Sequence, residues 1–103
     1  MKGMNDLLRQ AQLMQSKMAK LQEELGDRQI EAGSGGGMVK VVCNGKQEII
    51  SIKIEKEAVN AEDIDMLEDL VLTAVNEGLR LSREMAEQQM GALTGGLKIP
   101  GLM

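Results

Sequence analysis

Apolar residues recur every three or four positions along the first quarter of the chain. The steps alternate between three and four residues, which is the heptad pattern that gathers side chains on one face of a helix. Most intervening residues are good helix formers, and Gly26 follows the last apolar position as a helix-ending residue. We therefore expect a helix over 4–25, with its apolar face formed by Met4, Leu7, Ala11, Met14, Met18, Leu21 and Leu25.

The period changes from helical to alternating in the next segment, 28–56. Between Ile50 and Glu55 each isoleucine is followed by a polar residue, as in an antiparallel strand with one buried face. On the strand before it, one face is shared by Val39, Val41 and Cys43. The segment is therefore predicted to form a sheet that packs against helices on one side.

Glycines and an Asn-Gly pair divide this segment into three strands. The glycine-rich run 33–37 separates a short strand over 28–32 from a second strand over 38–43. Asn44 and Gly45 both tolerate a positive φ, so they predict a two-residue hairpin turn into the third strand. The prediction is a three-stranded antiparallel meander.

A second helical pattern extends over 60–90. Asn60 is the predicted N-cap, and the acidic residues that follow it favour a helix start. From Ser82 onward apolar residues become sparse, so we expect the first half to be buried and the second to project as an arm. Glycines and a proline over 91–103 predict a flexible tail. The apolar positions of the helix are Ile64, Leu67, Val71, Ala74, Gly78, Leu81 and Met85.

The composition excludes several kinds of site. The chain has 103 residues, 43% of them hydrophobic and 27% charged, which fits one folded domain over 1–103. It contains no His and no aromatic residue, which excludes His-based catalytic triads, His metal sites and aromatic platforms for nucleic-acid bases. Because Cys43 is the only cysteine, no intrachain disulfide can form, and a reducing compartment fits best.

The sequence indicates neither export nor membrane insertion. The first ten residues lack the apolar segment of a signal peptide, and no apolar run approaches the length of a membrane span. We therefore expect a cytoplasmic protein without membrane contact.

Candidate chemical sites are weak. The glycine run 33–37 has no Lys-Ser/Thr ending and no helix after it, which favours a hairpin loop over a phosphate cradle. The acidic residues over 62–69 lack the spacing of a calcium loop, and Cys43 has no His to activate it. We expect no enzyme, no catalytic residue, no metal, no cofactor and no small-molecule substrate. The alternative is an enzyme that uses the acidic cluster with a divalent metal.

The first helix is too long for the sheet that this chain can build. Its 22 residues span roughly 33 Å, whereas a strand of about seven residues spans only about 23 Å. The apolar face nevertheless runs the full length of the helix, and a three-stranded sheet has two open edges. A two-fold homodimer with protruding helices is the favoured solution. The alternative is that the overhanging face folds back on the second helix.

Charge is distributed unevenly along the chain. The segment 57–77 carries −7, and because the whole chain carries −4, the remainder carries +3. The first 22 residues alone carry +3, from four basic residues and Asp6. Local charge governs within a Debye length of about 8–10 Å, so an acidic protein can still present a basic arm to a polyanion. The plainer interpretation is that scattered basic residues only keep a helix face solvated.

Several sequence segments together resemble the YbaB/EbfC family of bacterial nucleoid-associated proteins. The resemblance covers nearly the whole chain, and it rests on the order of the segments and not on a catalytic motif. The strongest match runs from the glycines through the Asn-Gly turn to the third strand. The matching segments are Gly35–Val41, Asn44–Lys46, Ile50–Ile54, Met4–Gln12, Asp65–Val71 and Leu97–Met103.

The resemblance implies a fold and a function. The fold is α+β, with a three-stranded antiparallel sheet flanked by a long N-terminal helix and a C-terminal helical segment. Members form homodimers whose helices protrude like tweezers and bind double-stranded DNA with little sequence preference. They are thought to organise the nucleoid and to influence gene expression. The implied location is the cytoplasm and nucleoid.

Charge and expected exposure suggest which residues contact DNA. Binding through the phosphate backbone would release counterions and weaken steeply with salt. The alternative is a dimeric protein-interaction adaptor, docked through the apolar helix face, with incidental DNA contact. The candidate DNA contacts are Lys2, Arg9, Lys17, Lys20, Arg80 and Arg83, followed in rank by Lys40, Lys46 and Lys53.

Overall fold

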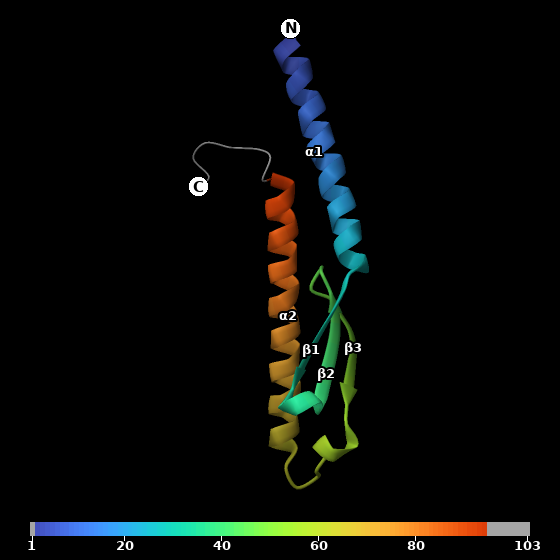
Figure 1. Cartoon of the computed structure of the whole chain (residues 1–103), viewed down its shortest axis with the longest axis vertical. Helices are drawn as coiled ribbons and strands as arrows, with labels where there is room; N and C mark the ends of the chain where they lie inside the picture. The colour runs from blue at the N-terminus through green and yellow to red at the C-terminus, as the bar shows by residue number, and fades with distance from the viewer. Residues whose placement is uncertain (1, 95–103) are drawn as a thin grey trace.

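Two long helices and a three-stranded sheet make up the molecule. The computed structural model describes residues 2–94 (Figure 1). One helix lies along the sheet, and the other leaves one end of the sheet and continues beyond it (Figure 1). In chain order the elements are α1 (Lys2–Asp27), β1 (Gln29–Ser34), η1 (Gly35–Gly37), β2 (Val39–Asn44), β3 (Ile49–Ile54), η2 (Lys56–Ala58) and α2 (Ile64–Thr94).

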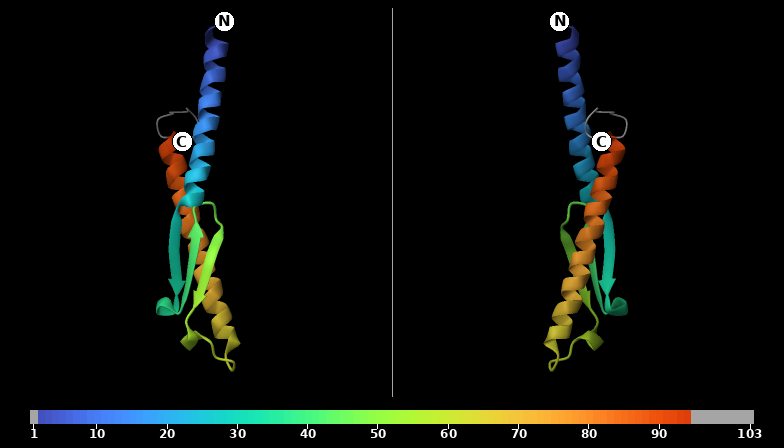
Figure 2. Two further views of the ribbon diagram at one scale, coloured as in Figure 1. Left: turned by 90° about the vertical axis from the view of Figure 1, so that its right-hand side faces the viewer. Right: turned by 90° about the vertical axis from the view of Figure 1, so that its left-hand side faces the viewer.

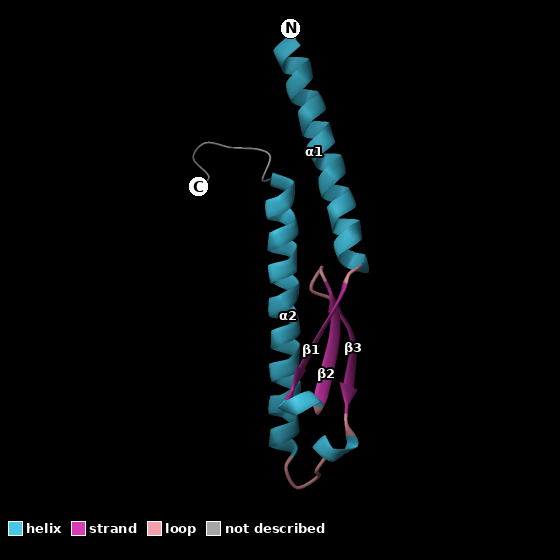
Figure 3. Ribbon diagram, viewed as in Figure 1, coloured by secondary structure: helices cyan, strands magenta, loops and turns pink. Residues whose placement is uncertain are grey.

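The strands form an antiparallel meander in the order β1-β2-β3 (Figure 3). Ala32 of β1 lies opposite Val41 of β2, which in turn lies opposite Ile52 of β3. The predicted α+β class and meander are therefore confirmed. A register shift at Val42/Cys43 marks a bulge where β3 begins. The three glycines of η1 all have positive φ, so the glycine run forms a tight 3-10 turn between β1 and β2.

Small residues on α2 allow this helix to lie close to the sheet. Ala74, Gly78 and Ser82 are spaced four apart, so they share one face, and all three are buried. That face packs on Val41 and Cys43 of β2, which are also fully buried. A Cβ placed on Gly78 would lie 3.3 Å from Cys43 Sγ and 3.5 Å from Val41 Cγ1. Close approach of backbone to sheet thus fills the core without any aromatic side chain.

Ser82 belongs to the packed part of α2, contrary to the expectation that the arm begins there. Its hydroxyl accepts a hydrogen bond from the Gln47 amide at 2.9 Å and donates one to the Asn44 carbonyl at 2.7 Å. Both partners lie at the β2–β3 turn, and Ser82 has no exposed surface. A polar residue is buried here because two backbone groups of the turn need a partner.

The Asn-Gly pair does not form the predicted two-residue turn. The loop has three residues, Gly45–Gln47, and the Asn44 amide closes it by donating to the Glu48 carbonyl at 3.0 Å. The residue with positive φ is Gln47, at 62°. The Asn44 side chain instead organises the loop, because its Oδ1 accepts from the amides of Lys46 at 2.9 Å and Glu48 at 3.1 Å.

The same turn also holds the end of α1. The Gly45 amide donates to the Leu25 carbonyl at 2.8 Å, and Asn44 Nδ2 donates to the Gly26 carbonyl at 3.2 Å. These bonds satisfy carbonyls that a helix end leaves free. Gly26 has no positive φ and does not end the helix, which continues to Asp27. The predicted glycine cap is therefore wrong, because the turn caps the helix instead.

Helix α2 starts later and ends later than predicted. Asp63 is the N-cap, since its Oδ1 accepts from the Met66 amide at 3.2 Å. Asn60 lies in a turn before the helix, where its Oδ1 accepts from the Glu62 amide at 3.0 Å. Of the predicted tail 91–103, residues 91–94 belong to α2, and the remainder lies outside the described residues.

The arrangement is elongated and one-sided. The molecule measures 73 × 26 × 16 Å. Figure 2 shows α2 covering one face of the sheet while the opposite face carries no helix. Helix α2 lies over β1 and β2 and much less over β3. Within residues 2–94, no helix has the length and apolar content needed to cross a bilayer.

Candidate nucleic-acid interface

The N-terminal part of α1 projects from the body of the molecule. Only its last turns pack, through Leu21 and Leu25, which are 8% and 3% exposed. Met4 and Leu7 on the same apolar face are 64% and 66% exposed. We call residues 2–20 the α1 arm. The predicted overhang is therefore present. Its apolar face is exposed toward the N-terminus, whereas Met14 and Met18, nearer the body, are half-buried.

Two basic residues of the arm lie on the side away from its apolar face, whereas Lys17 lies beside that face, four residues before Leu21. Arg9 and Lys20 are eleven residues apart, close to three helical turns, so their side chains point in similar directions. Both are exposed, and neither takes part in an ion pair in the described part of the chain. Lys2 lies in the first turn of α1. The arm thus offers a line of cations along about 16 Å of helix between Arg9 and Lys20.

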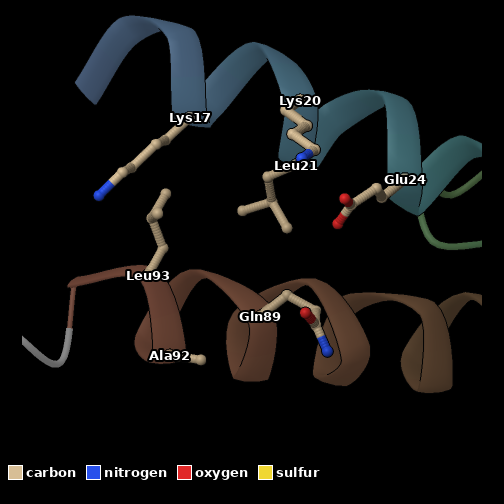
Figure 4. Close-up of a pocket in the computed structure, with 7 residues that line it drawn as sticks. All are labelled: Lys17, Lys20, Leu21, Glu24, Gln89, Ala92 and Leu93. Carbon is tan, nitrogen blue, oxygen red and sulfur yellow. The ribbon is translucent and has the colours of Figure 1, made fainter. Parts of the chain in front are cut away.

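Two of the predicted lysines meet the end of α2. Lys17 and Lys20 line a hollow of about 300 Å³ between the two helices (Figure 4). The α2 side of the hollow contributes Gln89, Ala92 and Leu93. Figure 4 shows Lys17 extending from α1 into this space, Lys20 lying close to the α1 ribbon, and the Glu24 carboxylate in the same space nearer the sheet. An anionic group entering the hollow would meet the ammonium groups of Lys17 and Lys20 and also the carboxylate of Glu24.

The two predicted arginines of α2 differ in their surroundings. Arg80 is held by carboxylates on both sides, with Nε 3.0 Å from Glu77 Oε2 and Nη1 2.8 Å from Glu84 Oε1. These hydrogen bonds and charges raise the pKa of Arg80 and lower that of Glu77. Arg83 is exposed and has no ion pair in the described part of the chain. Of these two arginines, only Arg83 has a charge that no carboxylate of the described chain pairs with.

Seven of the sixteen acidic residues gather at the other end of the molecule, where no basic residue accompanies them between positions 57 and 77. They occupy η2, the following turn and the first half of α2, far from the N-terminus of α1 (Figure 1). The long axis therefore has a basic end and an acidic end. A polyanion would be attracted to the first and repelled by the second. The acidic set is Glu57, Glu62, Asp63, Asp65, Glu68, Asp69 and Glu77.

The second-ranked lysines lie on the sheet and its turn. Lys40 and Lys53 are direct partners across β2 and β3, on the face without a helix. Like charges placed opposite each other are unfavourable without an anion nearby. Lys46 lies in the β2–β3 loop. These lysines are separate from the α1 arm and its hollow.

A second exposed surface, which is apolar, lies on β3 and the adjoining side of α2. The sequence did not predict it. Because α2 leaves β3 largely uncovered, Ile52 and Ile54 remain 46% and 40% exposed on the face that carries the core. Beside them, α2 residues line an open hollow of about 440 Å³. Alternation identified the strand, but it could not show that the helix covers only two strands. The α2 lining is Leu67, Glu68, Val71, Leu72 and Val75.

The described residues contain no side-chain cluster arranged to bind a metal. No group of three or more Cys, Asp or Glu side chains is arranged to hold a metal ion within residues 2–94. Cys43 is buried and donates to the Gly78 carbonyl at 3.1 Å. Burial raises the pKa of its thiol, which disfavours the nucleophilic thiolate.

Comparison with known sequences gives a consistent result. The model of the YbaB/EbfC DNA-binding family matches residues 1–97. A nucleoid-associated protein of Desulforamulus reducens is 61% identical over 97% of this chain and 95% of its own length. Another, from Pelotomaculum thermopropionicum, is 54% identical over 97% of this chain and 95% of its own length. The family consists of DNA-binding proteins and is not a family of enzymes.

A solved structure agrees with the fold. The uncharacterized protein HP0035 from Helicobacter pylori superposes with a TM-score of 0.79 at 26% sequence identity. The match covers 86% of this chain and 94% of that one. The sequence match and the shared fold lead to one conclusion: this chain is a member of the YbaB/EbfC DNA-binding family.

Proposed function

We propose that the chain binds double-stranded DNA through its phosphate backbone, with little sequence preference, and so organises the nucleoid and influences gene expression. The observation that carries the proposal is the charge arrangement of α1. An arm projects from the body with exposed cations on one side, while a cluster of seven acidic residues lies at the opposite end of the molecule. A protein of net charge −4 can in this way direct a cationic surface toward DNA.

The proposed contacts are mainly on the α1 arm. Arg9 and Lys20 would meet phosphates along one strand, while Lys17 would reach them from the hollow beside α2. Each neutralised phosphate releases counterions. The logarithm of the binding constant therefore falls linearly with the logarithm of the salt concentration, with a slope of about −0.9 per phosphate contact. Phosphate contacts carry no direct sequence information, which accounts for weak preference. The proposed contacts of the wild-type chain are Lys2, Arg9, Lys17, Lys20 and Arg83. Arg80 is a sixth candidate whose guanidinium already binds Glu77 and Glu84.

We infer further that two copies pair through the apolar surface on β3 and α2. Half-exposed isoleucines on an edge strand, beside an open apolar hollow, form the kind of patch that a homodimer interface covers. A two-fold axis would double the arms and allow both to contact one duplex. Pairing would also cover the open edge of β3.

Light scattering of a matched pair of variants tests the dimer. Ile52→Glu places a charge on the proposed interface, whereas Ser51→Glu places it on the opposite face of the same strand. We expect a halved mass for Ile52→Glu and an unchanged dimer mass for Ser51→Glu and the wild type. A monomeric wild type at micromolar concentration would contradict the pairing.

An electrophoretic shift series tests DNA binding. The wild type is mixed with several duplexes of unrelated sequence at salt concentrations from 50 to 200 mM. We expect retardation of every duplex, weakening linearly with log salt. No shift at the lowest salt would refute the proposal.

The exposed apolar face of the α1 arm favours one other function. Met4, Leu7 and Leu8 are each more than half exposed, as expected if a protein partner docks there. In that case the chain is a dimeric adaptor with incidental DNA contact. Leu7→Ser would then abolish partner binding, while leaving the shift series unchanged.

A further inference from the structure

The guanidinium of Arg80 already donates three hydrogen bonds to carboxylates of the same chain. Nε and Nη2 donate to the two carboxylate oxygens of Glu77, and Nη1 donates to Glu84 Oε1 at 2.8 Å. All three side chains are on the solvent side of α2, with 47%, 41% and 52% of their surfaces exposed for Arg80, Glu77 and Glu84. The arginine is therefore accessible, but three of its five N–H donors already bind carboxylates of the same chain.

The geometry at Arg80 is the one that a phosphate would require. A guanidinium binds carboxylate and phosphate oxygens with the same planar pair of N–H groups. Glu77 occupies that pair, and Glu84 takes a further donor from the other side of the helix turn. The arginine lowers the pKa of Glu77, chiefly through their hydrogen bond. A DNA phosphate that takes the planar pair of donors now bound to Glu77 must displace that carboxylate.

The neighbouring charges on α2 provide an internal comparison. Glu87 lies two helical turns after Arg80, on the same exposed face, and forms no ion pair within the described part of the chain. Neutralising Glu87 changes the net charge by the same amount as neutralising Glu77 or Glu84. The local effect on Arg80 can therefore be separated from the general effect of charge.

We propose that Glu77 and Glu84 act as an intramolecular substitute for DNA phosphate at Arg80, and so limit the affinity of the chain for DNA. The inference rests on the proposed DNA-binding function and refines it. Arg83 can bind phosphate directly, whereas Arg80 must first exchange a carboxylate of its own chain for the phosphate. Because the carboxylates already neutralise Arg80, its exchange onto DNA releases few mobile counterions and adds little to the salt dependence.

Fluorescence anisotropy with a labelled duplex tests this proposal on the full chain. The variants Glu77→Gln and Glu84→Gln are compared with Glu87→Gln between 50 and 200 mM salt. We expect all three to bind more tightly than the wild type, with Glu77→Gln and Glu84→Gln at least twofold tighter than Glu87→Gln. Their slopes against log salt should steepen by up to about 0.9 per copy, which is one added phosphate contact.

Removing the arginine completes the test. Arg80→Gln alone should leave the wild-type affinity nearly unchanged, whereas Arg83→Gln should weaken it. In an Arg80→Gln background, Glu77→Gln should have no advantage over Glu87→Gln. Thermal melts followed by circular dichroism confirm that each variant is folded.

Two results would overturn the inference while leaving DNA binding intact. The first is equal affinity of Glu77→Gln, Glu84→Gln and Glu87→Gln, because the ion pairs would then serve only to stabilise the helix. The second is a loss of affinity in Arg80→Gln as large as that in Arg83→Gln, because Arg80 would then already contact DNA. Failure of the wild type to bind any duplex would instead refute the proposed function itself.

Discussion

The body of the molecule and the α1 arm differ in what they bury. In the body, formed by β1, β2 and α2 as far as Ser82, the helix approaches so closely that Ala74 and Val41 are completely buried. In the arm, Met4 and Leu7 are about two-thirds exposed although they continue the same kind of apolar pattern. The difference teaches that a heptad pattern predicts a helix and its apolar face, but not what covers that face.

The two regions also differ in how they tolerate polar and charged groups. The body satisfies each polar group that it buries, as Ser82 shows with two hydrogen bonds to the β2–β3 turn. Basic residues of the arm stay in solvent, where a second molecule can reach them. Stability is therefore concentrated in the body, and the proposed DNA contacts are concentrated in the arm.

The largest expected effect comes from filling the space at Gly78. Gly78→Leu would force its side chain against Cys43 and Val41, where even a Cβ lies 3.3 Å from sulfur. We expect a loss of about 3 kcal/mol in the free energy of unfolding, measured by urea denaturation. Gly91→Leu is the control, because a Cβ there meets nothing within 4 Å. Equal losses in both variants would show that close helix–sheet packing does not hold the body together.

The next effect comes from removing the Ser82 hydroxyl. Ser82→Ala leaves the Gln47 amide and the Asn44 carbonyl without their buried partner. We expect a loss of about 2 kcal/mol by urea denaturation. Ser16→Ala, at an exposed position of the arm, should change stability by less than about 0.5 kcal/mol. A Ser82→Ala variant as stable as the wild type would mean that Ser82 belongs to a projecting, unpacked part of α2, as the sequence indicated.

A smaller effect of opposite sign is expected at the turn. Gln47 has a φ of 62°, a conformation that costs a residue with a Cβ about 1 kcal/mol. Gln47→Gly keeps the backbone amide that donates to Ser82 and removes this cost. We expect a gain of up to about 1 kcal/mol in the urea experiment. Gly45→Ala, where Leu25 lies 2.8 Å from the added Cβ, should destabilise instead.

The smallest effect is a pH dependence from Cys43. Burial raises the pKa of its thiol above the ordinary value of 9.0, so the folded chain holds this proton more tightly than the unfolded chain. The resulting stability is fully present below pH 9 and is lost as pH rises through the raised pKa. Urea midpoints measured from pH 8 upward should fall more for the wild type than for Cys43→Ala. Identical pH profiles would mean that the thiol is not desolvated.

The sequence predicts the elements well because each depends on a short period. Alternation identified the strand that contains Ile52, and steps of three and four identified both helices. These local patterns could not show that Ser82 is buried, because the partners of its hydroxyl lie 35 and 38 residues away in the chain. The turn was missed for a similar reason, since Asn44 and Gly45 are engaged with the end of α1.

The candidate site was predictable in part. The shared face of Arg9 and Lys20 follows from their spacing on one helix. The engagement of Arg80 also had a sequence signal, because Glu77 and Glu84 lie three residues before and four residues after it. The exposed face of β3 had none, since it depends on how far α2 extends across the sheet.

The most direct test of the division between body and arm compares two double variants of equal charge. Arg9→Gln/Lys20→Gln alters the arm, and Lys40→Gln/Lys53→Gln alters the open sheet face. Anisotropy with a labelled duplex measures affinity over a salt series. We predict a large loss for the arm variant, with a salt slope reduced by about 0.9 for each lost contact, and a small loss for the sheet variant. Equal losses, or a greater loss for the sheet variant, would contradict the assignment of DNA binding to the α1 arm.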